Sequence, residues 1–207
     1  MIIHKCYICG MDIHTKSIGL NASTMLEKNS TNALLNCPFC GVSNQFFTVL
    51  DDDLEGLVME LSLEAKSIIE KAVKLEVFNS TFYEEASERV DCKILSVTFK
   101  ELSKIELMHA RIHMRLISMD KPPVLHKPDY SNRETDYAFI KEAEAREKHA
   151  ITFYSKNVEN INIEKVKKVF EALRKVESEH NSIMSTKAFE LCQVQNQNIN
   201  ELSTEIG

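Results

Sequence analysis

The sequence has 207 residues, of which 43% are hydrophobic, so the chain is long enough to build a hydrophobic core in one or two domains. It carries 25 Lys and Arg residues against 31 Asp and Glu residues, a formal net charge of −6, and it contains no block of basic residues. Because binding to a phosphate backbone normally requires a basic face, we expect no nucleic-acid partner.

The hydropathy pattern argues against a membrane-spanning segment. The longest uninterrupted apolar runs have four residues, at Cys6–Cys9 and Tyr137–Ile140, whereas a helix needs about 20 apolar residues to cross a bilayer. Residues 1–10 lack the cationic and apolar regions of a secretory signal. We therefore expect a cytoplasmic protein with no membrane partner.

Glycine and proline divide the chain into parts. Three of the five glycines lie in the first fifty residues, none occurs between Leu57 and Ile206, and three of the four prolines cluster between Pro122 and Pro128. Since helices avoid both residue types, the pattern predicts three parts in chain order. They are a turn-rich module over residues 1–50, a helical domain with a proline connector over residues 51–190, and a polar, frayed tail over residues 191–207.

The N-terminal module contains two Cys-x-x-Cys-Gly motifs, with 27 residues between Cys9 of the first and Cys37 of the second. Each such turn can direct two thiolates at one ion, so the two motifs together predict a tetrahedral four-thiolate metal site. Structural disulfides are the less favoured alternative, because cytosolic thiols stay reduced. The spacing leaves two metals open: one iron in a rubredoxin-like module, or one zinc in a zinc ribbon. The predicted ligands are Cys6, Cys9, Cys37 and Cys40.

Two helical blocks follow the module. The acidic run Asp51–Asp53 suits a helix N-terminus, and from there to Ile117 apolar residues recur at intervals of three and four, with a break near Arg89–Asp91. The second block behaves alike and breaks near Asn157–Asn162. Two helical hairpins joined by one long connector predict a mainly α protein, with a four-helix bundle after the small cysteine module.

Six acidic or imidazole side chains fall on the apolar faces of these helices. A lone buried carboxylate is so unfavourable that it usually protonates or finds a partner. Four of the six residues form two Glu-x-x-His pairs, a spacing that puts both side chains on one helix face. The six residues are Glu76, Glu106, His109, Glu147, Glu177 and His180.

These residues belong to an internal repeat. Glu76, Glu106 and His109 each have a counterpart 71 residues later, and so do Phe82 and Tyr83. Each hairpin therefore contributes one Glu from its first helix and one Glu-x-x-His pair from its second. In an antiparallel bundle, groups at matching depth on all four helices converge on one region of the core.

The charge of this set predicts a metal site. Four carboxylates and two neutral imidazoles carry a charge of −4, which two divalent cations neutralise, and mixed ligands of this kind suit iron or manganese. One Glu-x-x-His pair alone could be a chance occurrence on a solvated helix face. Two such pairs and two lone glutamates in one repeat make up the ligand set of ferritin-like di-iron and di-manganese bundles.

The helical blocks resemble the rubrerythrins, which are ferritin-like di-iron proteins. On the third predicted helix, six residues separate Glu147 from Tyr154, and the first helix repeats this spacing from Glu76 to Tyr83. The resemblance implies that the six residues are iron ligands, with Glu106 and Glu177 as the bridging carboxylates. It implies that Tyr83 and Tyr154 hydrogen-bond the ligands and orient them. The alternative is that both are ordinary core aromatics.

The sequence departs from the rubrerythrin pattern at one position. Rubrerythrins usually carry an extra carboxylate one turn beyond the lone glutamate of the third helix, where this chain has Ala150. Glu144 is the candidate to replace it, although its position on an acidic helix favours a solvated neighbour. In rubrerythrins this extra carboxylate takes part in the movement of an iron between ligands. Its absence therefore puts that ligand exchange, and with it an efficient peroxidase activity, in question. His113, one turn beyond His109, is expected to be a polar or partly exposed neighbour, with a contact to a ligand as the alternative.

The resemblance implies a non-haem di-iron oxidoreductase that reduces hydrogen peroxide to water. Electrons would come from an external donor through the four-cysteine iron, and the order of the two modules is that of reverse rubrerythrins. Because the family assembles head-to-tail, we expect a homodimer or higher homo-oligomer, in which the acceptor site can lie in a neighbouring subunit. The alternatives are a ferroxidase, a dioxygen-reacting or dimanganese protein, or a zinc-ribbon scaffold without redox turnover.

Overall fold

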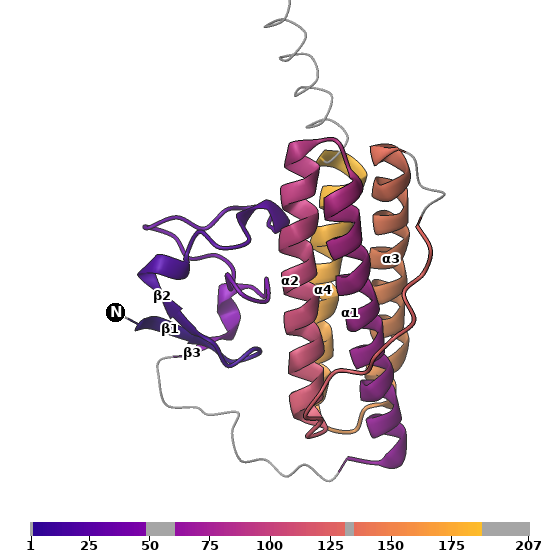
Figure 1. Cartoon of the computed structure of the whole chain (residues 1–207). Helices are drawn as coiled ribbons and strands as arrows, with labels where there is room; N and C mark the ends of the chain where they lie inside the picture. Colours follow the sequence, from indigo (N-terminus) through magenta and orange to yellow (C-terminus); the bar gives the residue numbers. More distant parts are fainter. Residues whose placement is uncertain (1, 49–60, 131–134, 188–207) are drawn as a thin grey trace, which may run out of the picture.

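The computed structural model describes residues 2–48, 61–130 and 135–187 (Figure 1). Over these ranges the chain forms a small N-terminal module of strands and short turns, which lies against a bundle of four long helices. This confirms the predicted mainly α class. None of the helices in these ranges is long and apolar enough to cross a membrane. The predicted boundary at residues 50 and 51, the acidic run Asp51–Asp53 and the predicted tail 191–207 lie outside the described residues.

The N-terminal module is built on a three-stranded antiparallel sheet in the order β2-β1-β3. Its strands are β1 (Ile2–Cys6), β2 (Asp12–His14) and β3 (Phe47–Thr48). The register pairs Lys5 with Asp12 on one side and with Thr48 on the other. The first Cys-x-x-Cys-Gly motif therefore forms the turn between β1 and β2.

The first and third of the four helices end where the sequence predicts breaks. The four helices are α1 (Leu63–Arg89), α2 (Lys93–Leu116), α3 (Asp136–Asn157) and α4 (Glu164–Ser182), the last continuing into a π-helical turn over Ile183–Lys187. The side chain of Ser62 accepts a hydrogen bond from the Ala65 amide at the start of α1, and Thr135 caps α3 in the same way through Ala138. Such caps satisfy amides that the first helical turn leaves free.

The long connector decides how the two hairpins are placed. After α2 it runs back along the bundle, so α3 starts at the end of the bundle where α1 finishes (Figure 1). As a result α1 is antiparallel to α3, and α2 is antiparallel to α4. The turn of the first hairpin and the turn of the second therefore lie at opposite ends of the bundle.

The core of the bundle consists of two hydrophobic clusters with a polar layer between them. On α1, Ile69 and Ala72 belong to the cluster that also includes the module cysteines, Phe82 belongs to the other cluster, and buried Glu76 lies between them in the sequence. The other three helices follow the same pattern, with their predicted ligands between residues of the two clusters. The fold therefore places the six predicted ligands in the interior of the bundle, between two apolar clusters.

Candidate metal centres

The structure brings the six predicted bundle ligands together, and all six are fully buried at 0% exposure. Their ligand atoms form two overlapping groups, and within each group the atoms lie within 4.8 Å of one another. One group is Glu76, Glu106, His109 and Glu177; the other is Glu106, Glu147, Glu177 and His180. Glu106 and Glu177 belong to both groups, so the geometry provides two adjacent positions that share two carboxylates.

The shared carboxylates each present one oxygen to each imidazole. Glu106 places Oε2 3.7 Å from Nδ1 of His109 and Oε1 3.3 Å from Nδ1 of His180. Glu177 places Oε1 3.0 Å from Nδ1 of His109 and Oε2 3.5 Å from Nδ1 of His180. Ligand atoms bound at about 2.1 Å to one ion lie about 3 Å or slightly more apart. The spacing therefore fits two ions bridged by both carboxylates.

The atoms that could bind the two ions are also the atoms left without hydrogen bonds. Eight of them have no hydrogen-bond partner among the described residues: Glu76 Oε2, Glu147 Oε2, both oxygens of Glu106 and Glu177, and Nδ1 of His109 and His180. Buried polar atoms without a partner are rare in folded proteins and indicate a missing ligand or ion. The donor set divides into four atoms for each position, so the residues present fit a pair of divalent ions.

The pKa values reflect this concentration of charge. Burial and the neighbouring carboxylates raise the pKa of Glu76 and Glu147 well above its usual range. Burial also acts to raise the pKa of Glu106 and Glu177, but the electrostatic attraction of the two nearby histidines outweighs it and lowers both values. The histidine pKa is lowered by burial and raised more strongly by Glu106 and Glu177, to about 9 for His180. Without a bound cation, protons thus take over part of the charge compensation.

Two buried tyrosines hold the outer glutamates, each across the hairpin boundary. The Tyr83 hydroxyl on α1 donates to Oε1 of Glu147 on α3, and the Tyr154 hydroxyl on α3 donates to Oε1 of Glu76 on α1. Each glutamate therefore keeps Oε2 free. Seven residues span about 10.5 Å of helix, and in antiparallel helices this offset brings each tyrosine level with the other helix's glutamate. Both tyrosines therefore contact candidate ligands.

His113 is a residue that the sequence analysis underestimated. It is fully buried rather than partly exposed, and its Nε2 lies 2.8 Å from the hydroxyl of Tyr154. Burial and the neighbouring His109 lower the pKa of His113 to about 3, so the imidazole is neutral. The signal that could have revealed it is its i, i+4 spacing from His109, which puts both imidazoles on one face of α2.

The four predicted thiolate ligands also converge. All four cysteines are buried and free, and their sulfurs lie within 4.8 Å of one another. Sγ of Cys6 is 3.8 Å from Sγ of Cys40, and Sγ of Cys9 is 3.6 Å from Sγ of Cys37. A tetrahedral ion with metal–sulfur bonds of about 2.3 Å places its sulfurs about 3.8 Å apart. The cluster thus has the geometry of a four-thiolate site.

The glycine that ends each cysteine motif is required by the backbone and by the bundle. Gly10 and Gly41 have φ angles of +73° and +75°, in the left-handed region that favours glycine. A Cβ on Gly10 would lie 2.5 Å from Nη1 of Arg115, and one on Gly41 would lie 2.8 Å from Cγ1 of Val176. The two turns therefore sit directly against α2 and α4.

One hydrogen bond connects the two candidate centres within a single chain. Nε2 of His109, a predicted bundle ligand, lies 3.0 Å from the backbone oxygen of Cys40, a predicted thiolate ligand. Arg115 strengthens the same interface, because its Nη2 donates to the backbone oxygen of Ile8 over 2.9 Å. The Cys40 oxygen accepts the Nε2 proton of His109, which leaves Nδ1 free for an ion.

The structure places Glu144 away from both groups of candidate ligands. It is 9% exposed and bonds to Lys141 and Lys148, 2.5 Å away in the second case. It is therefore a lysine-paired residue rather than a freely solvated one, and it does not replace the extra rubrerythrin carboxylate. Ala150, at that position, is fully buried in a hydrophobic cluster.

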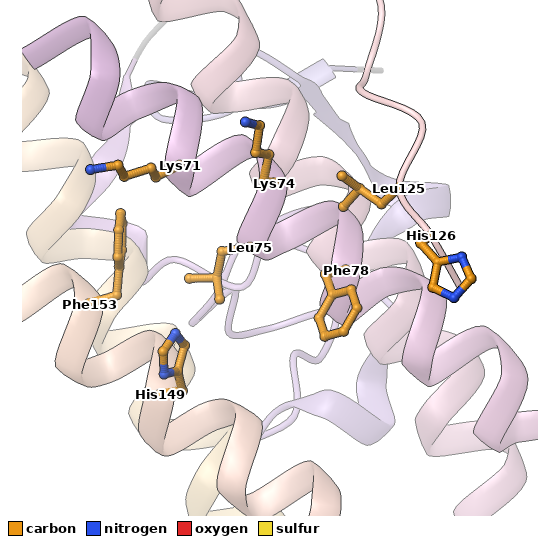
Figure 2. A pocket seen from close by; sticks show the side chains of 8 residues that line it. All are labelled: Lys71, Lys74, Leu75, Phe78, Leu125, His126, His149 and Phe153. Atoms are coloured by element: carbon orange, nitrogen blue, oxygen red, sulfur yellow. The ribbon is translucent and has the colours of Figure 1, made fainter. Parts of the chain in front are cut away.

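A cavity of about 540 Å³ is lined by side chains from α1, α3 and the connector (Figure 2). Its lining includes Lys71, Leu75, His126, His149 and Phe153, and none of its lining residues belongs to either metal-binding group. Leu75 and Phe153 directly precede Glu76 and Tyr154 in the sequence. Since no candidate ligand lines it, the cavity is separate from the candidate centres.

Comparison with known protein families agrees with this architecture. The family model described as Rubrerythrin matches residues 67–186, more than half of the chain, and covers all six candidate bundle ligands. No curated protein matches the chain. The four-cysteine cluster precedes the matched region. The chain therefore belongs to the rubrerythrin family, with a rubredoxin-like four-cysteine module ahead of its ferritin-like helical domain.

Proposed function

We propose that this protein is a non-haem di-iron oxidoreductase that reduces hydrogen peroxide to water. The observation that carries the proposal is the set of eight buried donor atoms that lack hydrogen-bond partners among the described residues. They form two positions that share Glu106 and Glu177. When bound, two ferrous ions would supply the two electrons that, together with two protons, convert one hydrogen peroxide into two water molecules. Manganese has similar ligand preferences and is the alternative metal.

The residues of the chain have distinct roles in this proposal. Glu106 and Glu177 would hold both ions, because each offers one oxygen to each position. Glu76 and His109 complete one position, and Glu147 and His180 complete the other. The tyrosine hydroxyls donate to the outer glutamates, which fixes the free oxygen of each toward the ions.

The four-cysteine module supplies electrons in this proposal. Cys40 supports a direct route, because its sulfur belongs to the thiolate cluster and its carbonyl contacts a bundle ligand, His109. The route comprises the covalent bonds of Cys40, a single hydrogen bond, and the His109 ring from Nε2 to Nδ1. It lies within one chain, so electron transfer does not require the expected head-to-tail oligomer. The thiolate iron would in turn be reduced by an external donor.

The test uses the full-length protein with iron in both centres, reduced without oxygen and mixed with hydrogen peroxide. We expect the bundle iron to oxidise faster than free ferrous ion under the same conditions, followed by the red absorbance of oxidised thiolate iron. Oxidation no faster than that of free iron contradicts the proposal. Faster reaction with dioxygen than with peroxide favours a ferroxidase, and a zinc-filled cysteine site leaves the visible spectrum empty.

A further inference from the structure

The two halves of the bundle centre are related by the repeat, so residues 71 positions apart can be compared directly. Tyr83 and Tyr154 are counterparts, and each donates to an outer glutamate. Phe99 and Phe170 are also counterparts, 71 residues apart, and their rings lie 5.5 Å and 5.2 Å from the rings of the respective tyrosines. The repeat breaks at His113, whose counterpart is Met184, a residue only 1% exposed.

The hydrogen-bond inventory fixes the direction of the bonds around Tyr154. A phenol has one proton, and Tyr154 donates it to Oε1 of Glu76. The proton in the 2.8 Å contact between Tyr154 and His113 must therefore come from Nε2 of His113. In a neutral imidazole this leaves Nδ1 as an acceptor, and Nδ1 of His113 is indeed buried without a hydrogen-bond partner among the described residues. A bare acceptor is the less costly group to bury unpaired.

The imidazole is also held firmly in place. Its ring stacks on that of Tyr154 at 5.8 Å, and the edge of Phe170 packs against both rings. On the other side of the centre, Met184 has a thioether, which cannot donate a hydrogen bond. Within the described part of the chain, the Tyr83 hydroxyl therefore has no donor that corresponds to His113 of α2 at Tyr154.

We propose that His113 is a positioning residue that makes the two metal positions inequivalent. Its Nε2–H holds the Tyr154 hydroxyl on Glu76, which fixes the free oxygen of this glutamate for the ion shared with His109. This inference rests on the proposed bundle centre. Its consequence is that the position served by Glu76 and His109 binds its ion more tightly than the position served by Glu147 and His180. Loss of such an outer contact typically weakens metal binding about 10–100-fold.

The test compares three variants of the full-length protein. His113→Met copies the second repeat, His113→Gln keeps an N–H donor, and Met184→Leu is the matched control. Binding of ferrous ion to the bundle is measured by anaerobic titration, and the two iron environments are measured by Mössbauer spectroscopy. We expect two binding steps in the unaltered protein. His113→Met should weaken the tighter step about 10-fold and make the two iron signals more alike, His113→Gln should retain most of the difference, and Met184→Leu should change neither step.

Unchanged affinities and unchanged iron signals in His113→Met overturn the inference. If that variant does not fold, Tyr154→Phe provides the second route: it removes the hydroxyl but keeps the ring, and it should weaken the same step. Failure to do so also overturns the inference. An unaltered protein that binds fewer than two ions in the bundle contradicts the proposed centre itself, which is a separate result.

Discussion

At the scale of single residues, the four glutamates of the bundle are chemically alike but differ in the number of positions that they serve. Glu106 and Glu177 contact both histidines through different oxygens. Glu76 and Glu147 each belong to one group only and give their second oxygen to a tyrosine. The loss of Glu106 or Glu177 should therefore affect the binding of both ions. The loss of Glu76 or Glu147 should affect the binding of one ion.

This difference predicts the metal content of single variants. Glu106→Ala should weaken metal binding at both positions, whereas Glu76→Ala should weaken it at one. In each case the loss should be at least about 100-fold, which is the upper end for loss of a group that only hydrogen-bonds a ligand. Metal analysis after dialysis against a weak chelator measures the ions retained. Glu171→Ala, on an exposed part of α4, is the control and should retain both.

Stability separates loss of metal ligation from misfolding in these variants. In the metal-free state, Glu76→Ala should unfold no more readily than the parent protein, because it removes a buried carboxylate that repels its neighbours. Glu106→Ala should unfold more readily than the parent, because it removes a buried partner of His109 and His180. A Glu106→Ala protein that keeps both ions argues against the bridging role of this residue.

At the scale of elements, the turns of the N-terminal module are shaped by the helices that they contact. Gly41 needs its left-handed backbone to close the second cysteine motif, and Val176 of α4 fills the space that a side chain would need. Gly19, in the same module, has no neighbouring atom within 4 Å of an added Cβ. A side chain at position 41 would therefore strain the backbone and collide with α4, whereas one at position 19 would meet no neighbouring atom.

Substitution of these glycines tests the packing of the module on the bundle. Gly41→Ala should lower the free energy of unfolding by about 1–3 kcal/mol, the usual range for a strained backbone position. Gly19→Ala should change it by no more than about 0.5 kcal/mol, as is usual for surface changes. Chemical denaturation of the two variants with the four-thiolate site filled provides the measurement. Equal effects would show that module and bundle do not constrain Gly41.

At the scale of the whole molecule, metal binding and stability are coupled through pH. In the metal-free protein the pKa of His180 is about 9, above the unfolded value of about 6.5. This histidine therefore stabilises the fold below about pH 6.5, and the contribution is lost as pH rises through 9. The raised pKa of Glu76 and Glu147 acts in the same direction, since both prefer to remain neutral in the fold. Bound ions require deprotonated ligands, so their stabilisation increases with pH.

The midpoint of thermal unfolding should therefore differ more between the manganese-loaded and manganese-free protein at pH 9 than at pH 6.5. Manganese prefers carboxylate and imidazole ligands to thiolates, so it tests the bundle while the cysteine site stays filled. Unfolding curves at four pH values between these limits measure the difference. A difference that shrinks as pH rises would contradict the proposed protonation of the empty centre.

The helical hairpins, the two kinds of candidate metal ligand and the repeat that relates them can all be predicted from the sequence. These features are local: helix periodicity, motif spacing and a constant offset of 71 residues can all be read along the chain. The helix breaks after Arg89 and Asn157 were predicted for the same reason. The start of α1 at Leu63 was not predicted, because the cap at Ser62 is a weaker signal than the acidic run before it.

Which of these groups contact one another depends on how the helices and the module pack. Whether Tyr154 contacts its own hairpin or the other depends on the direction in which α3 packs against α1, which the connector sets. The contact of Cys40 with His109 depends on how the module rests on α2, and the burial of His113 depends on Phe170 from another helix. These contacts join residues far apart in the sequence, and no single-helix pattern encodes them, because they arise only when the faces of different elements pack together.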